Sequence, residues 1–475
     1  MANSTVGAGV LSLPFAFQAT GLLGGLILCV VVGITEALTL YVLSKFAERY
    51  KARTYVELVR RALGRKLAVL LSSVLVVAMF GACVAYLIIL SDNLSSLAAA
   101  ANLPRWIADR HRITAFLGIG VLLPMCFPRQ LTALARMNQV AVLGFLVGAG
   151  LVAYRGFTIA FSRPDPLEGV ELLVVNYDSL FAIPIIVFGF NCHSTVVSIF
   201  HELEPTPTVV VPVLPSSPSA FRRFRYIPRP ASRKLVGMLS VIMASTSLVM
   251  AVYVTVGISG YMAFPDNVSS NILMSFDRDD IMVQIARLAV TLIVMGSYPL
   301  THHPARAGFE HLVKPATPAG AVEPLDSDVD ALPAGVSRLT SVAFTLAFVL
   351  SSTAVAEVVT DLGVVLHLLG GLCISFIIFF LPGLLLINAA ILKYSRTVLE
   401  ELEGQEDGQG VADEEQTLPS SLTQPLLQRL QSARDKGIKK SGIIYAPRLS
   451  WQFGTALLVL SVLVAGVTLL TVILG

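Results

Sequence analysis

Long apolar runs separated by short charged segments constrain the fold of this sequence more than any other feature. A helix needs roughly 20 apolar residues to cross a bilayer, and eleven such runs follow one another along the chain. They cover approximately residues 3–19, 22–44, 67–90, 113–127, 137–161, 179–200, 235–258, 281–301, 339–356, 362–387 and 453–474. Charged residues make up only 14% of the chain, whereas an ordinary soluble domain carries about 25%. The sequence therefore predicts an all-α integral membrane protein with about eleven transmembrane helices.

The distribution of Lys and Arg predicts how these helices are oriented. If the N-terminus is cytoplasmic, 27 of the 34 Lys and Arg residues fall in inner loops, in line with the excess of positive charge on the cytoplasmic side of membranes. The inner loops are then 45–66, 128–136, 201–234, 302–338 and 388–450. Because the number of spans is odd, the C-terminus is expected outside or in a lumen. Two Asn-x-Ser sequons, at Asn93 and Asn267, lie on the outer side, where glycosylation can occur.

The chain divides into a membrane core, a linker and a last helix. Residues 1–392 form the expected core with helices one to ten, followed by a cytoplasmic linker over 393–450 and the eleventh helix over 451–475. An inner loop at about 205–232 interrupts the core and is rich in Pro, Ser and Arg, while the linker runs from acidic to basic. Such compositions bury too little apolar surface to fold. We expect both segments to be disordered.

Composition and motifs argue against several classes of function. A formal net charge of +3 is too small to indicate nucleic-acid binding. The five cysteines lie within apolar runs and lack the spacing of a zinc site or a disulfide framework. The sequence contains no His-Glu-x-x-His motif, nucleophile elbow or phosphate-binding loop. We therefore expect no enzyme, no cofactor and no obligate protein partner; the expected partners are the lipid bilayer and a small-molecule solute.

Two of the apolar runs are interrupted by Gly and Pro at corresponding places. The first contains Gly7, Gly9 and Pro14, and the sixth contains Pro184 and Gly189. Discontinuous helices at matching positions of two halves are typical of inverted-repeat transporters, whose substrate site lies between them near the bilayer midplane. Spans one and six would then begin two five-helix repeats, with the eleventh span as an addition.

A broken helix offers both kinds of backbone group that an amino acid needs. Free N–H groups suit a carboxylate, and unwound carbonyl groups suit an ammonium group or Na+. We therefore predict a substrate site formed by Val6, Gly7, Ala8, Gly9, Phe188, Gly189, Asn191 and His193. The alternatives are that the Gly-x-Gly pair is a helix-packing surface, that His193 makes only a structural hydrogen bond, and that the aromatic rings only pack.

Glu36 is the clearest ionisable group inside a predicted span. A charge at the bilayer centre costs about 2.5 to 3.5 kcal/mol or more, so its presence needs a reason. Glu36 could accept hydrogen bonds from the unwound backbone of the broken helices, carry a proton, or be a buried acid satisfied by a neighbouring helix.

Several segments resemble a known family. The first run, NSTVGAGVLSLPFAFQATG, is similar to the opening of the sodium-coupled neutral amino acid transporter family within the amino acid/auxin permease superfamily. FGFNCHSTVVSIFHELEPT in the sixth run and the segments 287–306 and 361–382 continue the likeness, which covers nearly the whole chain except the two inner linkers. The resemblance implies a LeuT-like fold of eleven spans and solute uptake coupled to an ion gradient.

The resemblance also implies where a coupling ion binds. Family members use a first-span asparagine, here Asn3, and a hydroxyl in span eight, here Ser297, for Na+. Met295 stands where another hydroxyl is common. Na+ and H+ therefore both remain candidates for the coupling ion, and Glu36 or His193 are the candidates to carry a proton.

The expected function is secondary active transport of neutral amino acids, because apart from His193 the predicted site offers no ionised side chain. A membrane amino-acid sensor that signals through its inner loops would have the same pocket and remains the alternative. The membrane in which the protein resides, whether plasma membrane or vacuolar or endolysosomal membrane, also stays open.

Overall fold

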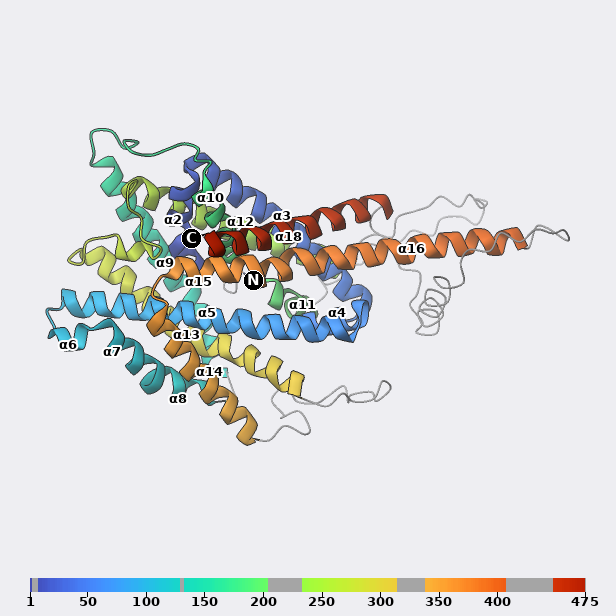
Figure 1. Cartoon of the computed structure of the whole chain (residues 1–475), viewed down its shortest axis with the longest axis horizontal. Coiled ribbons are helices and arrows are strands. Elements are labelled where there is room, and N and C mark those ends of the chain that lie inside the picture. Colours follow the sequence, from blue (N-terminus) through green and yellow to red (C-terminus); the bar gives the residue numbers. More distant parts are fainter. Residues whose placement is uncertain (2–6, 129–131, 204–232, 314–337, 407–446, 475) are drawn as a thin grey trace, which may run out of the picture.

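The protein is helical throughout the part that the structure describes. A computed structural model describes residues 1, 7–128, 132–203, 233–313, 338–406 and 447–474, and every regular element in these ranges is a helix. Nine helices within them are long and apolar enough to cross a membrane, and several of them run side by side in Figure 1. The predicted all-α membrane fold is therefore confirmed.

Each of the eleven predicted runs contains helix. The nine long spans are α3 (Leu22–Tyr50), α5 (Arg65–Ala100), α9 (Thr132–Phe161), α10 (Tyr177–Gly189) with α11 (His193–Glu202), α12 (Arg233–Ala263), α13 (Ile281–Val313), α14 (Arg338–Val358), α15 (Leu362–Leu368) continuing into α16 (Leu381–Glu406), and α18 (Pro447–Leu474). The first predicted span corresponds to η1 (Ala8–Ser12) and α2 (Leu13–Thr20), and the fourth to α7 (Arg110–Ala115), η2 (Phe116–Leu122) and α8 (Leu123–Cys126). The number of crossings and the inverted repeat stay predictions.

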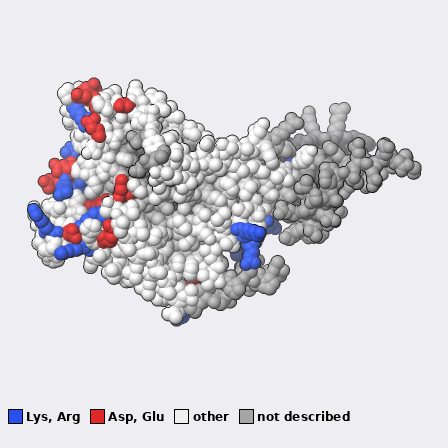
Figure 2. Space-filling model, in the orientation of Figure 1, with Lys and Arg blue, Asp and Glu red and all other residues white. Residues whose placement is uncertain are grey.

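The charged side chains gather at the ends of the molecule. Figure 2 shows Lys, Arg, Asp and Glu at the end that carries α6 (Arg105–Ala108), Lys and Arg beside α4 (Tyr55–Leu63) towards the other end, and a largely uncharged zone between them. Within this zone α3 exposes a row of apolar side chains, Ile27, Val31 and Ile34, each more than half exposed. Because water would oppose this exposure, the uncharged zone fits the hydrocarbon core of a bilayer.

Helix α4 was not predicted, because residues 45–66 read as an inner loop. In the structure α3 continues to Tyr50, and α4 follows after a short turn. The Thr54 side chain caps α4 by accepting a hydrogen bond from the backbone N–H of Glu57 (3.2 Å). The spacing Thr-x-x-Glu is a known signal for a helix start. The buried Tyr55 hydroxyl then donates to the carbonyl of Ile377 (3.0 Å), which ties α4 to the tenth span.

The sequon at Asn93 is not a glycosylation site in this fold. Asn93 lies within α5 and is 0% exposed, so this fold has no room for a glycan on its side chain. Asn267 lies in the connection between α12 and α13 and is exposed, as the prediction requires. The inner loop 205–232 and residues 407–446 of the linker lie outside the described residues, and α16 extends to Glu406, past the predicted end of the core.

Candidate functional site

The sixth span is interrupted in the structure at Gly189. Helix α10 ends there, α11 begins at His193, and residues 190–192 between them are not helical. Pro184 was predicted to contribute to the interruption, but it lies inside α10. The carbonyl of Gly189 accepts a hydrogen bond from the buried Tyr253 hydroxyl on α12 (2.7 Å). Tyr253 thus satisfies a carbonyl that the broken helix leaves free.

The first span has an irregular start that meets this interruption. Gly7 precedes η1, a 3₁₀-helical stretch that continues into α2. A Cβ atom on Gly9 would lie 2.7 Å from the Cα of Gly189 and 3.5 Å from Phe188 Cδ1. The start of the first span and the interruption of the sixth therefore cross backbone against backbone. Gly9 therefore packs against the sixth span and would position the backbone groups beside it rather than touch a substrate itself, whereas Gly7 faces the Tyr86 hydroxyl (3.4 Å from the position of a Cβ).

Two polar side chains of α3 face the interruption. Glu36 and Thr39 are both buried and lie three residues apart, on one face of α3. The Cys192 thiol donates to Glu36 Oε1 (3.3 Å). Thr39 Oγ1 lies 2.8 Å from His193 Nε2. The structure therefore shows Glu36 as a buried acid that accepts a hydrogen bond from a side chain of the interrupted helix.

The Thr39 hydroxyl lies within hydrogen-bond distance of three groups. They are the carbonyls of Glu36 (2.9 Å) and Thr35 (3.0 Å) and His193 Nε2 (2.8 Å). With its one proton on a carbonyl, Thr39 accepts from His193 Nε2–H; with its proton on Nε2, a neutral ring carries its own proton on Nδ1. No described residue pairs with the buried Nδ1 of His193 or with the buried Oδ1 of Asn191. The interruption thus holds two buried polar atoms without a described partner.

These two atoms stand beside the start of α11. No side chain caps that helix within the described structure, and the N-terminus of a helix favours negative charge. One short segment therefore combines backbone donors, which suit a carboxylate, with the Asn191 oxygen, which suits an ammonium group. Of the predicted substrate residues, the structure places Gly9 against Gly189 and Phe188. Gly7 and Ala8 precede Gly9 in the chain, Asn191 lies in the interruption and His193 follows it; Val6 lies outside the described residues.

The predicted ion site is described only on its α13 side, since Asn3 also lies outside the described residues. Ser297 Oγ donates to the carbonyl of Ile293 (2.9 Å), so its lone pairs point away from that bond. Pro299 lies inside α13 and cannot donate to the carbonyl of Met295. Met295, whose side chain offers no oxygen, can therefore supply one from its backbone.

A polar contact links α13 to the first span. Thr301 of α13 lies close to the Tyr86 hydroxyl of α5, and this hydroxyl is the group that faces Gly7. Neither contact was predicted, because Tyr86 lies in an apolar run that reads as an ordinary membrane helix.

The connection between α12 and α13 packs against η1 and α2 of the first span. Ser12 Oγ on η1 donates to the carbonyl of Ser270 (2.5 Å), and Gln18 Nε2 on α2 donates to that of Pro265 (2.9 Å). Arg287, buried in α13, donates to the carbonyl of Leu273 (2.8 Å) in η3 (Ile272–Met274). These bonds hold the connection against both the first span and α13.

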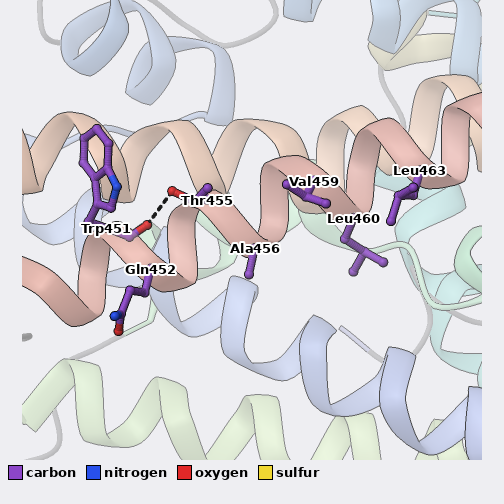
Figure 3. A pocket seen from close by; sticks show the side chains of 7 residues that line it. All are labelled: Trp451, Gln452, Thr455, Ala456, Val459, Leu460 and Leu463. Carbon is purple, nitrogen blue, oxygen red and sulfur yellow. Dashed lines mark hydrogen bonds between the residues drawn. The ribbon is translucent and has the colours of Figure 1, made fainter.

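Two cavities in the described structure are apolar. One of about 10 Å³ lies between η1, α9, α12 and α13, room for about one water molecule at most. The other is an open groove of about 670 Å³ along one side of α18, between Trp451 and Leu463 (Figure 3). Neither cavity is lined by the polar groups that gather at the interruption, so the crossing at Gly9 and Gly189 stays the candidate site.

Comparison with known proteins identifies the family. A family model described as transmembrane amino acid transporter protein matches residues 1–214 and 228–402. The chain is 30% identical to sodium-coupled neutral amino acid transporter 7 of Xenopus laevis over 397 residues, 81% of this chain and 78% of the relative. It is 27% identical to vacuolar amino acid transporter 5 of Schizosaccharomyces pombe over 387 residues, 81% of each chain.

The same resemblance extends to budding yeast. Vacuolar amino acid transporter 6 of Saccharomyces cerevisiae is 24% identical over 322 residues, 66% of this chain and 64% of the relative. These matches confirm the family resemblance noted in the sequence, and the relatives are named as transporters, as expected for a protein that is not an enzyme. The chain therefore belongs to the transmembrane amino acid transporter protein family.

Proposed function

We propose that this protein is a secondary active transporter that moves neutral amino acids across a membrane, with the substrate bound where the first span crosses the interrupted sixth span. The observation that carries the proposal is the contact of Gly9 with Gly189, because it joins two irregular spans at one point. Sites of this construction expose backbone groups inside a protein that is otherwise satisfied by helical hydrogen bonds.

The side chains around the crossing favour a neutral substrate. Among the described ionisable groups there, Glu36 already accepts from Cys192, and His193 Nε2 already shares a hydrogen bond with Thr39. A substrate with a charged side chain would need an opposite charge that is free to pair with it. A zwitterion with a neutral side chain needs only the backbone donors of α11 and acceptors such as Asn191 Oδ1.

The crossing also suits alternating access. Helices α10 and α11 are separated by residues 190–192 and can change their relative angle there, while the connection between α12 and α13 holds the outer end of the first span. Rocking of one half against the other around a fixed central site is the general mechanism of such transporters. Binding of the coupling ion, Na+ or H+, would bias this rocking.

Uptake by the purified protein in liposomes tests the proposal. Radiolabelled Gln, Ala, Leu, Lys and Glu are offered under an inward Na+ gradient, a pH gradient, or neither, with protein-free liposomes as the control. We expect uptake of the neutral amino acids above Lys and Glu, and dependence on one of the two gradients. Higher uptake of Lys or Glu, or uptake against a concentration gradient with neither ion gradient present, would contradict the proposal.

The coupling ion is assigned by one pair of variants. If Na+ is the ion, Ser297→Ala should raise the Na+ concentration for half-maximal uptake by roughly tenfold, the effect of losing about 1.4 kcal/mol of binding. Ser351→Ala is the matched control, because Ser351 also donates within its own helix but is exposed on α14. Uptake that follows only the pH gradient, with Ser297→Ala unchanged, assigns the proton instead.

A further inference from the structure

A group of exposed basic side chains lies where α4 meets α5. It consists of Arg60 in the last turn of α4 and of Arg65 and Lys66 at the start of α5. Gly64 between them has a φ of +100°, a backbone conformation that favours glycine and lets one helix turn directly into the next. These three side chains are called the basic corner below, and Figure 2 shows Lys and Arg gathered beside α4.

The basic corner has no acidic partner within the part of the chain that the structure describes. The acid of α4, Glu57, is already used: its side chain contacts Arg61 and accepts from the backbone N–H of Arg53 (2.7 Å). Arg61 in turn donates to the carbonyl of Tyr50 (2.7 Å) at the end of α3. These bonds satisfy Glu57 and Arg61 within the protein and leave the charges of the basic corner without a described counter-ion.

Arg65 and Lys66 also stand where the helix itself disfavours positive charge. Helix α5 begins at Arg65, its first turn contains no acidic residue, and no side chain caps its start. The start of a helix carries a partial positive charge, which repels cations. An anion from outside the protein would therefore stabilise Arg65 and Lys66 in this position.

Lys66 lies at the depth of the lipid headgroups. Val69 and Leu70 follow it by three and four residues on the same face of α5, and each is 46% exposed; Val77, further along this face, is 54% exposed. Because these apolar side chains face the hydrocarbon core, Lys66 lies about 4.5 to 6 Å beyond it along the helix. The headgroup layer on each side of the core is roughly 5 to 7 Å thick. The Lys66 ammonium group is therefore level with the lipid phosphates.

We propose that the basic corner binds the headgroup phosphates of anionic phospholipids in the leaflet on the basic side of the protein. Arginine and lysine donate charge-assisted hydrogen bonds to phosphate oxygens, and clusters of basic residues beside a membrane helix attract anionic lipids. The acyl chains lie along the exposed face of α5 at Val69, Leu70 and Val77. The corner thus supplies charge for the headgroup, and the helix supplies an apolar surface for the chains.

The charges at the other end of the molecule are arranged differently. There Arg110 Nε pairs with Asp92 (2.9 Å) and Arg155 pairs with Asp280, and Figure 2 shows Lys and Arg intermixed with Asp and Glu. A cation that is already paired with a carboxylate gains less from a phosphate. Positive charge beside a span is usual on the cytoplasmic side; the basic corner differs in having no described acid beside it and in adjoining a lipid-facing row of side chains.

Helix α4 connects the basic corner to the interrupted sixth span. Ser198 Oγ of α11 donates to the carbonyl of Arg53 just before α4 (3.2 Å), and Asn388 Nδ2 of α16 donates to the carbonyl of Ala62 within α4 (3.1 Å). Movement of α11 therefore changes the position of α4 relative to the membrane surface. A lipid bound at the corner favours the arrangement of α4 and α11 described here over the alternatives.

Thermal unfolding of the full chain in detergent tests lipid binding without reference to transport. Melting temperatures are measured while phosphatidylserine or phosphatidylcholine with the same acyl chains is added. A ligand that binds the folded state raises the melting temperature. We expect a larger rise with phosphatidylserine, and we expect the difference between the lipids to vanish at about 1 M salt, where charges are screened within about 3 Å. Equal shifts with both lipids at low salt would overturn the proposal.

Charge-removing variants place the effect at the corner. The triple variant Arg60→Gln, Arg65→Gln, Lys66→Gln should need about tenfold or more phosphatidylserine for the half-maximal shift. Lys66→Gln alone should change the response in the same direction by less, and it keeps the test independent of how well the triple variant folds. The matched control removes three exposed charges at the other end, with Arg105→Gln, Arg112→Gln and Arg278→Gln, and should respond as the wild type. Equal responses of the two triple variants would refute the assignment.

A soluble headgroup separates a lipid from a free anion. Glycerophosphoserine carries the phosphate and the serine of phosphatidylserine but no acyl chains. It should leave the melting temperature unchanged at concentrations at which phosphatidylserine acts, because it gains nothing from the apolar face of α5. A shift as large as that caused by the lipid would indicate a water-filled anion site and would overturn the assignment to a lipid.

Uptake measurements connect the lipid to transport, and this step rests on the proposed function. In liposomes with and without phosphatidylserine, the uptake rate of the wild type should differ by about fivefold, a typical coupling between two sites, whereas the corner variant should show one rate. If no protein transports in either lipid, the proposed function fails while the unfolding data still report on the corner. If the wild type and the corner variant respond alike, the connection from α4 to α11 fails alone.

Discussion

Gly9 is the residue at which the proposed site is most sensitive to change. Its neighbour is the backbone of Gly189, which cannot move aside as a flexible side chain would. We therefore expect Gly9→Ala to separate the two spans and to lower uptake at least tenfold, and Gly9→Val to abolish it, since overpacking costs about 1–3 kcal/mol. Uptake normalised to the protein present in the membrane measures the effect.

Gly150→Ala is the matched control for this prediction. Gly150 lies inside α9, where a Cβ would meet no atom within 4 Å, so the same chemical change should leave uptake near the wild-type level. Wild-type uptake by Gly9→Ala would show that the crossing tolerates a methyl group and would remove the main support for placing the site there.

The residues of the site were predictable to different degrees. Glycines in two separate apolar runs, Gly9 and Gly189, indicated both irregular spans without any structural information. Their mutual contact was not predictable, because it depends on how the two helices cross. The same holds for Glu36 with Cys192 and for Thr39 with His193: each pair joins residues about 155 positions apart, and the rotation of α3 about its axis determines which of its residues face α11.

At the scale of elements, the tenth span shows what an apolar run conceals. It contains two π-helical stretches, η4 and η5 (Phe376–Phe380), between α15 and α16. A π-helix alters the usual pattern of backbone bonds, and side chains from elsewhere serve carbonyls in this region: the Tyr55 hydroxyl bonds to Ile377, and Ser461 Oγ bonds to Ser375 (3.2 Å). The hydropathy of the run predicted a span correctly, but hydropathy does not show which distant side chains, here Tyr55 and Ser461, bond to its backbone.

The packing of the last two long helices gives a prediction at this scale. Helices α16 and α18 approach so closely that a Cβ on Gly454 would lie 2.8 Å from the carbonyl oxygen of Gly383, and the reverse contact is equally short. Gly454→Leu should therefore separate the helices and lower the melting temperature and the yield of monodisperse protein. The expected cost is about 1–3 kcal/mol.

Gly466→Leu on the same helix provides the comparison. A Cβ at Gly466 meets nothing within 4 Å, so the added side chain can extend into lipid with little effect on stability. Size-exclusion profiles and thermal unfolding of the two variants, purified side by side, measure the difference. Equal stability of the two would mean that α18 does not depend on this close contact.

For the whole molecule, hydropathy predicted where the membrane spans lie better than it predicted where the helices end. Membrane spans were correct because burying a helix in lipid requires long apolar runs, whatever the details of packing. The ends of the helices were less predictable: α5 runs to Ala100 and α16 to Glu406, well beyond their apolar runs. Outside the hydrocarbon region a helix can continue with polar residues, so hydropathy does not define where it ends.

The orientation of the molecule yields the last prediction. The basic end of the uncharged zone is expected to face the cytoplasm, which places Asn267 on the outer or lumenal side. In a eukaryotic host the protein should therefore carry a glycan that a glycosidase removes. Asn267→Gln should abolish the resulting shift in mobility, whereas Asn93→Gln should leave it unchanged, because Asn93 is fully buried within α5.

Thiol labelling checks the orientation even if Asn267 is not glycosylated. All five natural cysteines are buried and free, so a membrane-impermeant maleimide should report mainly on an introduced cysteine. Lys66, at the start of α5, and Asn267, in the connection between α12 and α13, are both exposed. Asn267→Cys should react from the outer or lumenal side and Lys66→Cys only after the cytoplasmic side is opened to the reagent. The reverse pattern would mean that the basic end faces the outside or the lumen. The side of the membrane towards which each end of the crossing at Gly9 and Gly189 opens would then be reversed as well.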